Sequence, residues 1–333
     1  MLWTEKYRPT TFRGIIGQDS VVQHLASFAK NRFVPHLLLT GQHGTGKTSA
    51  IGCFARKIYN DNWLANTSVF QTADLFLSGK SYLEMDERYA HLYRKHESLL
   101  SNFKYIIKSY AAMRPLDAPF KLMVFEDAHA LPREAQQALR RIMERTSGTC
   151  RFIFITTNQS AIIPAISSRC LPLFFTQIDK SLMLKHLMEI RKNEAMNPSL
   201  HPCDDERLEL IVYISKGDLR RAILLLELVM KSGRSGDPAA VARSETATVA
   251  ASVLFALHKG DLRVATREIE SLMIDFGLSG SEVLSEIRPE IRREYNDPSL
   301  ALLLAETDFR LRHCNNEFIQ IASFVADLKE VLS

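Results

Sequence analysis

A glycine-rich run near the N-terminus has the residue types and spacing of a phosphate-binding loop. Residues 41–48 match the pattern G-x-x-x-x-G-K-[ST] at every fixed position. Glycine lets successive backbone N–H groups turn onto phosphates, the lysine reaches the β- and γ-phosphates, and the last hydroxyl holds Mg²⁺. The sequence therefore predicts nucleoside triphosphate binding. The predicted contacts are Gly41, Gln42, His43, Gly44, Thr45, Gly46, Lys47, Thr48 and Ser49, with Thr48 as a metal ligand.

Two further polar groups follow apolar runs. Glu126 and Asp127 end the run 122–127, where carboxylates can bind a metal and activate water. An acidic strand end beside a turn is the alternative, but the upstream phosphate loop favours the chemical interpretation. Asn158 follows the run 151–157, and its amide can orient water or simply make a turn.

These groups need strands and helices to position them. A short apolar run precedes the phosphate loop and a helical period follows it, which disfavours a chance glycine turn. Strands that alternate with helices predict a parallel sheet covered on both faces, with ligands beyond the carboxyl ends of the strands. The predicted strands are 37–39, 68–71, 122–125, 152–157 and 171–175.

The first residues carry a family resemblance. The segment 3–9, Trp-Thr-Glu-Lys-Tyr-Arg-Pro, followed by Ile-Gly-Gln at 16–18 and the phosphate loop, resembles the small subunit of replication factor C. That protein belongs to the clamp loader of archaea and eukaryotes, an AAA+ ATPase. The resemblance implies ATP and Mg²⁺ as ligands and places Tyr7, Arg8 and Pro9 beside the adenine. From the residues alone, an arm packed on a core edge is an equal alternative.

The same resemblance assigns roles to the polar groups. Relatives have Asp-Glu where this chain has Glu126 and Asp127, so Glu126 becomes the Mg²⁺-side ligand and Asp127 the catalytic base. Asn158 corresponds to sensor 1. Arg169, within Ser-Arg-Cys, corresponds to an arginine finger for a neighbouring subunit, and Arg220, within 217–221, to sensor 2. Without the resemblance, Arg169 would be an ion-pair residue and Arg220 an exposed helix charge.

Two segments are relevant to DNA binding. The helix predicted after Pro132 contains the run 135–144, which resembles the family segment that lines a central DNA chamber. Arg140 and Arg141 are therefore expected to contact primer-template DNA, although a solvated basic face is the alternative. Residues 65–119 depart from the family, and we expect the charged, tyrosine-bearing stretch 84–96 to be a solvated helix face rather than a DNA contact.

The expected fold is an α/β P-loop AAA+ core with a parallel sheet at 1–176, a small helical lid at 177–233, and an all-α collar at 234–333. A linker rich in glycine and serine is expected at 231–238. The collar helices are expected at 250–257, 262–274, 280–291, 298–312 and 317–332.

Composition excludes several classes of protein. The 333 residues are 46% hydrophobic and 24% charged, as in ordinary globular proteins, with a formal net charge of +4. There is no apolar run long enough for a membrane span and no signal-peptide core at the N-terminus, so we expect a cytoplasmic protein that binds no membrane. The five cysteines lie far apart in the sequence, which indicates neither a zinc site nor a disulfide framework.

The expected function is that of a clamp-loader small subunit, which uses ATP binding and hydrolysis to load a sliding clamp on primed DNA. Its expected partners are the other large and small subunits of a pentameric ring, the sliding clamp and DNA. One alternative is a poorly hydrolysing structural or regulatory subunit of the same ring, suggested by the reversed acidic pair. Another is a stand-alone nucleotide enzyme such as a kinase, which the collar and Arg169 disfavour.

Overall fold

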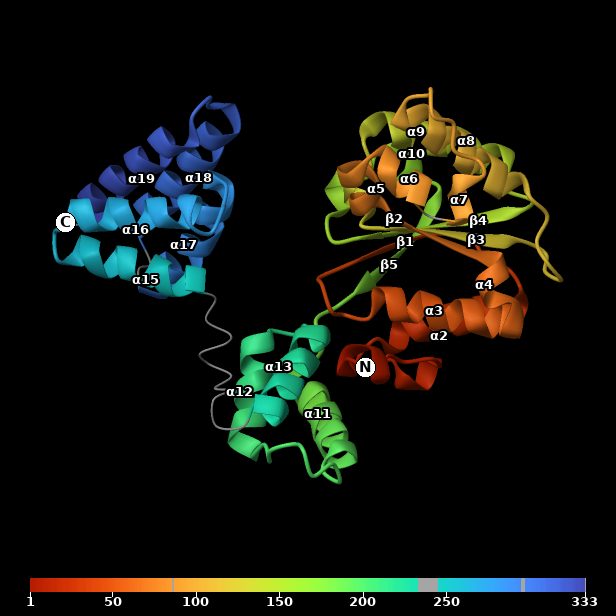
Figure 1. The fold of residues 1–333 in the computed structure, drawn as a ribbon, viewed down its shortest axis with the longest axis horizontal. Helices are drawn as coiled ribbons and strands as arrows, with labels where there is room; N and C mark the ends of the chain where they lie inside the picture. The colour runs from red at the N-terminus through yellow and green to blue at the C-terminus, as the bar shows by residue number, and fades with distance from the viewer. Residues whose placement is uncertain (86, 233–244, 295–296, 333) are drawn as a thin grey trace. The chain divides into compact units, whose positions relative to one another are not determined.

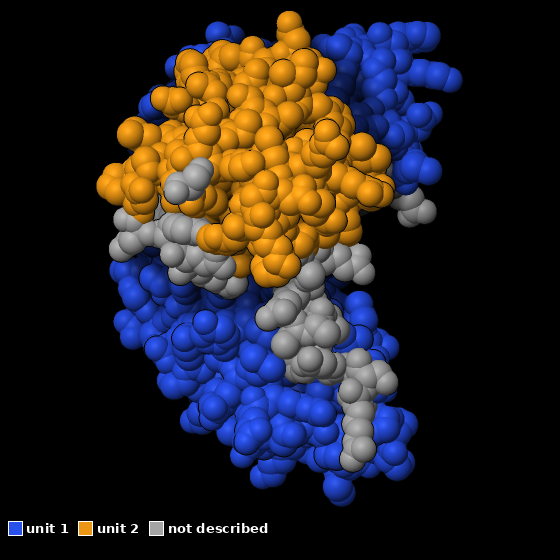
Figure 2. All heavy atoms as spheres, turned by 90° about the vertical axis from the view of Figure 1, so that its left-hand side faces the viewer, with its two compact units in different colours: residues 1–236 blue, residues 237–333 orange. Residues whose placement is uncertain are grey.

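The computed structural model describes residues 1–85, 87–232, 245–294 and 297–332. The chain forms two compact units, residues 1–236 and 237–333, which Figure 2 shows in different colours. Each unit is described by itself. The expected boundary at 233/234 and most of the expected linker 231–238 lie outside the described residues.

The first unit is built on a five-stranded sheet in the order β2-β3-β4-β1-β5, and every paired strand is parallel to its neighbour. This confirms the predicted parallel sheet. Because the phosphate loop follows β1 and the acidic pair ends β3, parallel pairing brings both to the same edge of the sheet. The strands are β1 (His36–Gly41), β2 (Thr67–Gln71), β3 (Lys121–Glu126), β4 (Cys150–Thr156) and β5 (Cys170–Phe175).

Helices cover both faces of this sheet, so its central strands are apolar without alternation. In β1, Leu38 packs into one apolar cluster, and Leu37 and Leu39 pack into the other. Figure 1 shows the two helical layers on either side of the strands. One layer contains α5 (Thr72–Ser78), α6 (Lys80–Met85), α7 (Glu87–Ala90), α8 (Leu99–Ala112), α9 (Arg133–Arg145) and α10 (Pro164–Ser167). The other contains α2 (Asp19–Asn31), α3 (Lys47–Tyr59) and α4 (Trp63–Asn66).

The tyrosine-bearing stretch 84–96 differs from the expectation of a solvated helix face. Tyr89 is fully buried and stacks on Phe70 at 4.9 Å, and Tyr93 packs against the same apolar cluster. The prediction was wrong for these aromatic side chains. The charged residues of a short helix do not reveal which of its aromatic side chains face the core. The burial of Tyr89 also excludes its ring from DNA contact.

Three further helices follow the sheet and have their own apolar core: α11 (Lys180–Glu194), α12 (Asp205–Ser215) and α13 (Leu219–Ser232). This is the helical lid segment expected from 177 onward. The short N-terminal helix α1 (Trp3–Lys6) packs against α13, and Trp3 is buried in the core of these three helices. In Figure 1 the N-terminus lies beside α13 and α11.

The described residues of the second unit form helices joined by short loops. Its helices enclose one apolar core, with Ile287, Phe324 and Val325 nearly inaccessible to solvent. Among the helices that the structure describes, none has both the length and the apolar character of a membrane span. The helices are α15 (Glu245–His258), α16 (Leu262–Ile274), α17 (Gly280–Glu294), α18 (Pro298–His313) and α19 (Glu317–Leu332).

Candidate nucleotide-binding site

Most of the predicted nucleotide contacts line one pocket of the first unit. Its walls include residues 7–9, residues 43–49 of the glycine-rich loop, the acidic pair 126–127, and Arg220. Gly41 and Gln42 do not line the pocket, but their carbonyl oxygens accept hydrogen bonds from Lys47, which does. A Cβ on Gly41 would lie 2.4 Å from the carbonyl oxygen of Phe175, so only glycine lets β5 approach β1 so closely.

The loop has the backbone geometry of an anion site. Gly44 and Gly46 have φ of 67° and 95°, a region that residues with a side chain rarely adopt. Helix α3 begins directly after Gly46 at Lys47, so the unpaired N–H groups of its first turn face the pocket. These features fit a phosphate ligand.

Lys47 is held in place by the loop itself. Its Nζ donates hydrogen bonds to the carbonyl oxygens of Gly41 (2.8 Å) and Gln42 (2.6 Å), and its side chain is 8% exposed. Burial lowers the pKa of Lys47. The charges of Asp127, Asp218 and Glu126 oppose this shift, and Arg220 adds to it. A negatively charged phosphate would stabilise the ammonium in the same way as these carboxylates.

The acidic pair is anchored by a strand that the sequence analysis did not include in the site. Gln71, paired with Glu126 across β2 and β3, donates from Nε2 to Glu126 Oε2 at 2.7 Å. The Thr72 hydroxyl lies within hydrogen-bond distance of the backbone carbonyls of Glu126 and Asp127. Asp127 has a φ of 49°, which is unusual for a non-glycine residue. The sequence feature that could have identified Gln71 as a site residue is its position at the end of a predicted strand.

The pocket also contains side chains that could bind Mg²⁺. Thr48 and Glu126 both line the pocket, so one hydroxyl and one carboxylate are available as ligands. Within the described ranges, no group of three or more His, Cys, Asp or Glu side chains could hold a metal. Mg²⁺ is usually bound by one or two carboxylates together with substrate phosphates, so it does not require such a group.

Asn158 follows β4, as expected, and its side chain makes a local turn contact. Its Oδ1 accepts hydrogen bonds from the backbone N–H of Ser160 (3.1 Å) and from the Ser160 hydroxyl (2.7 Å), which caps the short helix η4 (Gln159–Ala161). The neighbouring Thr157 lines the pocket. The turn interpretation therefore describes this side chain, and the sensor 1 role stays a prediction.

The lid completes the pocket. Arg220 lies in the first turn of α13, and the N–H of Leu219 donates to the carbonyl oxygen of Gly44 at 3.3 Å. A Cβ on Gly44 would lie 1.7 Å from Asp218 Oδ1, so the lid and the loop touch at a glycine. His186 of α11 also lines the pocket, which the sequence did not indicate. Burial lowers the pKa of His186, and the neighbouring Glu189 opposes this.

Comparisons with known proteins agree with this geometry. Residues 17–179 match the family described as DNA polymerase III, delta subunit, and residues 248–327 match the replication factor C C-terminal domain. The replication factor C small subunit of Archaeoglobus fulgidus is 34% identical, over 98% of this chain and 97% of the relative. The chain belongs to the replication factor C small-subunit family.

A further relative agrees with this family, and two solved structures agree with the fold. The replication factor C small subunit of Picrophilus torridus is 32% identical over 99% of this chain and 98% of the relative. A RuvB variant of Thermotoga maritima has a TM-score of 0.55 at 16% identity, covering 88% of this chain and 93% of that chain. The Orc1 protein of Aeropyrum pernix, in complex with DNA, has a TM-score of 0.56 at 17% identity. The match covers 99% of this chain and 87% of that chain. These two structures therefore share the fold of this chain.

Two arginine groups of this family member lie outside the pocket described above. Arg169 donates from Nη2 to Glu144 Oε1 at 2.7 Å and from Nη1 to the carbonyl oxygen of Ala165 at 2.7 Å. Its side chain is 37% exposed. Arg140 and Arg141 line a groove of their own, together with Arg133 and the segment 160–165. Neither group is part of the wall of the pocket that contains the glycine-rich loop.

Proposed function

We propose that this member of the replication factor C small-subunit family binds Mg²⁺ and ATP. We propose that it does so as one subunit of a pentameric ring of large and small subunits. ATP binding and hydrolysis would serve to open a sliding clamp and place it on primer-template DNA in the cytoplasm. The observation that carries the proposal is the pocket in which the loop, the acidic pair and the lid residue Arg220 meet. We also propose the division into core 1–176, lid 177–233 and collar 234–333.

In this proposal the loop N–H groups and Lys47 hold the phosphates, and Thr48 and Glu126 hold the metal ion. Arg220 contributes a positive charge from the lid, so the lid would close on the γ-phosphate. Residues 7–9 form the wall expected beside the adenine. Asp127 is proposed as the base that activates water.

The test is reconstitution with candidate clamp-loader subunits and a sliding clamp. We expect copurification as a complex whose mass by light scattering equals that of five subunits, and ATP-dependent transfer of the clamp to primed DNA. A chain that stays monomeric at micromolar concentration with all partners supplied would overturn the ring and favour a stand-alone nucleotide enzyme.

A second candidate, a subunit that binds ATP but hydrolyses it slowly, is favoured by one specific observation. Glu126 stands where the family has the shorter Asp, and its carboxylate is hydrogen-bonded to Gln71. Asp127, which stands where the family has Glu, is one methylene shorter than that residue. The exchange of these two residues, described in the Discussion, distinguishes the two candidates.

Replacing Arg169 with alanine tests a role in trans. We expect ATP affinity at this subunit's own pocket to be unchanged, because Arg169 is not part of its wall. Hydrolysis at the adjoining site should fall by about a thousandfold or more, which is the range for an arginine finger. The measurement is single-turnover hydrolysis in rings where only the adjoining site can turn over. Equal rates in wild-type and mutant rings would contradict the assignment.

Replacing both Arg140 and Arg141 with alanine tests DNA contact in the groove. Affinity for primer-template DNA should fall uniformly across sequences, and the slope of log K against log salt should become less steep by about 2, because two phosphate contacts release fewer counterions. Fluorescence anisotropy in a salt series on the assembled ring measures both quantities. If the slope stays the same, these arginines do not contact phosphates.

A further inference from the structure

The N-terminal helix α1 is part of the lid, although more than 170 residues separate it from the lid in sequence. Trp3 is 4% exposed and belongs to the apolar cluster formed by α11, α12 and α13. Tyr7 packs against the same cluster and lies edge-on to Trp3, with ring centroids 6.4 Å apart. The aromatic side chains of this segment therefore bind it to the lid.

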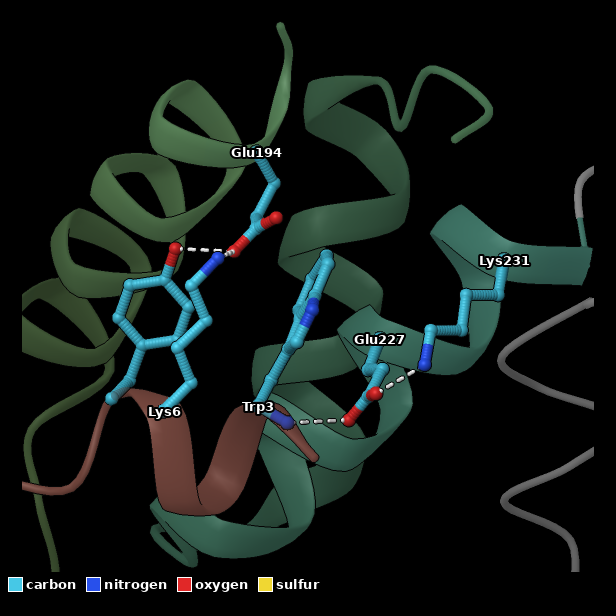
Figure 3. A network of polar contacts seen from close by, with 6 residues as sticks. Trp3, Lys6, Glu194, Glu227 and Lys231 are labelled. Atoms are coloured by element: carbon cyan, nitrogen blue, oxygen red, sulfur yellow. Dashed lines mark hydrogen bonds and ion pairs between the residues drawn. The ribbon is translucent and has the colours of Figure 1, made fainter. Parts of the chain in front are cut away.

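Two nearly buried carboxylates of the lid fix the same segment, as Figure 3 shows. Glu227 of α13 is 4% exposed, and its Oε2 accepts a hydrogen bond from the backbone N–H of Trp3 at 2.9 Å. Its other oxygen, Oε1, pairs with Lys231 Nζ at 2.6 Å. Glu227 thus binds one of the unpaired N–H groups at the start of α1.

Glu194, at the end of α11, binds the other end of α1. It is 6% exposed, and its Oε1 accepts from the Tyr7 hydroxyl at 2.6 Å and from Lys6 Nζ at 2.5 Å. Burial raises the pKa of Glu194, but the hydrogen bonds from Lys6 and Tyr7 and the charges of Lys6 and Lys231 outweigh it, so the pKa lies below its usual range. Glu194 is therefore an ionised acceptor for both side chains at neutral pH.

This segment continues directly into the nucleotide pocket. Tyr7, whose hydroxyl binds Glu194, lines the pocket together with Arg8 and Pro9. We propose that Glu194 and Glu227 are positioning residues for the nucleotide site. They hold residues 3–9 to the lid, so that the wall expected beside the base moves with the lid as one body. This inference rests on the proposed nucleotide-binding function.

The energetics of buried carboxylates agree with a positioning role. Removing a carboxylate from water is costly, and a buried ion pair is often no more stabilising than apolar residues of the same size. An aliphatic side chain at 194 or 227 would avoid that cost. It would not fix the N–H of Trp3 or the hydroxyl of Tyr7 at defined points.

The test measures binding of two ligands by calorimetry at fixed Mg²⁺. ATP contains the base, whereas inorganic triphosphate contacts only the phosphate side of the pocket. For Glu194→Ala and Glu227→Ala we expect ATP affinity to fall about tenfold, as for loss of a hydrogen bond to a charged group. Triphosphate affinity should stay within about twofold, because the loop, Lys47 and Arg220 are intact.

Conservative and control variants separate positioning from folding. Glu194→Gln keeps an acceptor for Tyr7 and loses the charge that pairs with Lys6, so ATP affinity should fall only about threefold. Glu209→Ala removes an exposed carboxylate of α12 and should change neither affinity. If an alanine variant does not fold, as judged by circular dichroism, the glutamine variant of the same residue, Glu194→Gln or Glu227→Gln, decides the question.

Two results would overturn the inference. Equal weakening of ATP and triphosphate would show that the carboxylates merely stabilise the lid, and unchanged ATP affinity in both alanine variants would show that they do not position the site. The wild-type chain is measured first with ATP. Failure of the wild type to bind ATP refutes the proposed function itself, whereas wild-type binding with either of the two results above refutes only the positioning role.

Discussion

Replacing Lys47 with alanine is expected to weaken ATP binding by about a hundredfold or more. Lys47 is the buried ammonium at the N-terminus of α3, and the loop carbonyls of Gly41 and Gln42 already hold it in position. Its loss removes a charge-assisted contact with phosphate, worth about 3 kcal/mol at the upper end of the usual range. The fold should be retained, because β1 and the rest of α3 do not depend on this ammonium.

The measurement is calorimetric titration with ATP and Mg²⁺, with thermal unfolding of each variant as a check on folding. Lys57→Ala is a matched control because Lys57 lies on the same helix with an exposed side chain. We expect its affinity to equal that of the wild type. A folded Lys47→Ala protein with unchanged affinity would contradict the assignment of this loop to phosphate binding.

The exchange Glu126→Asp with Asp127→Glu is expected to speed ATP hydrolysis by up to about a hundredfold. Both arrangements retain two carboxylates, so the charge of the site is unchanged. The reach of each group differs by one methylene, and a misplacement of about 1 Å at a reacting group can cost about a hundredfold in rate. The wild type should therefore bind ATP well and hydrolyse it slowly.

The structure adds a reason for this prediction. Gln71 donates a hydrogen bond to the carboxylate of Glu126, so this longer side chain extends from the end of β3 to the neighbouring β2. Mg²⁺ requires near-ideal octahedral geometry, and a carboxylate held in this way suits contact through water better than direct ligation. An aspartate at 126 is one methylene shorter, so we expect it to lose the contact with Gln71 and to be available as a direct metal ligand.

Turnover should be measured at this subunit's site within the assembled ring, for wild type, each single exchange and the double exchange. The Asp127→Glu single variant separates the effect of the longer base from that of the metal ligand. If the double exchange leaves the rate unchanged or lowers it, small backbone shifts already restore both distances and the slow-hydrolysis hypothesis is wrong.

Local sequence was sufficient for the five strands, the collar helices and the phosphate loop. All five strands predicted from apolar runs are present and parallel, and the collar helices end within a few residues of their expected bounds. Periodicity and the G-x-x-x-x-G-K-[ST] pattern depend on neighbours within a few residues, so they can be recognised without tertiary contacts. The meeting of Lys47 with Glu126 and Asp127 at one edge was also predictable, since parallel strands end together.

Contacts between distant residues were decided only by tertiary structure. The sequence could not show that Trp3 is buried among α11, α12 and α13, that Gln71 binds Glu126, or that Tyr89 stacks on Phe70. The N–H of Trp3 and its acceptor Glu227 are 224 residues apart. A short segment with no clear period has equal local preferences for several surfaces, and the apolar surface that covers it and the acceptors that pair with it exist only once the lid has folded.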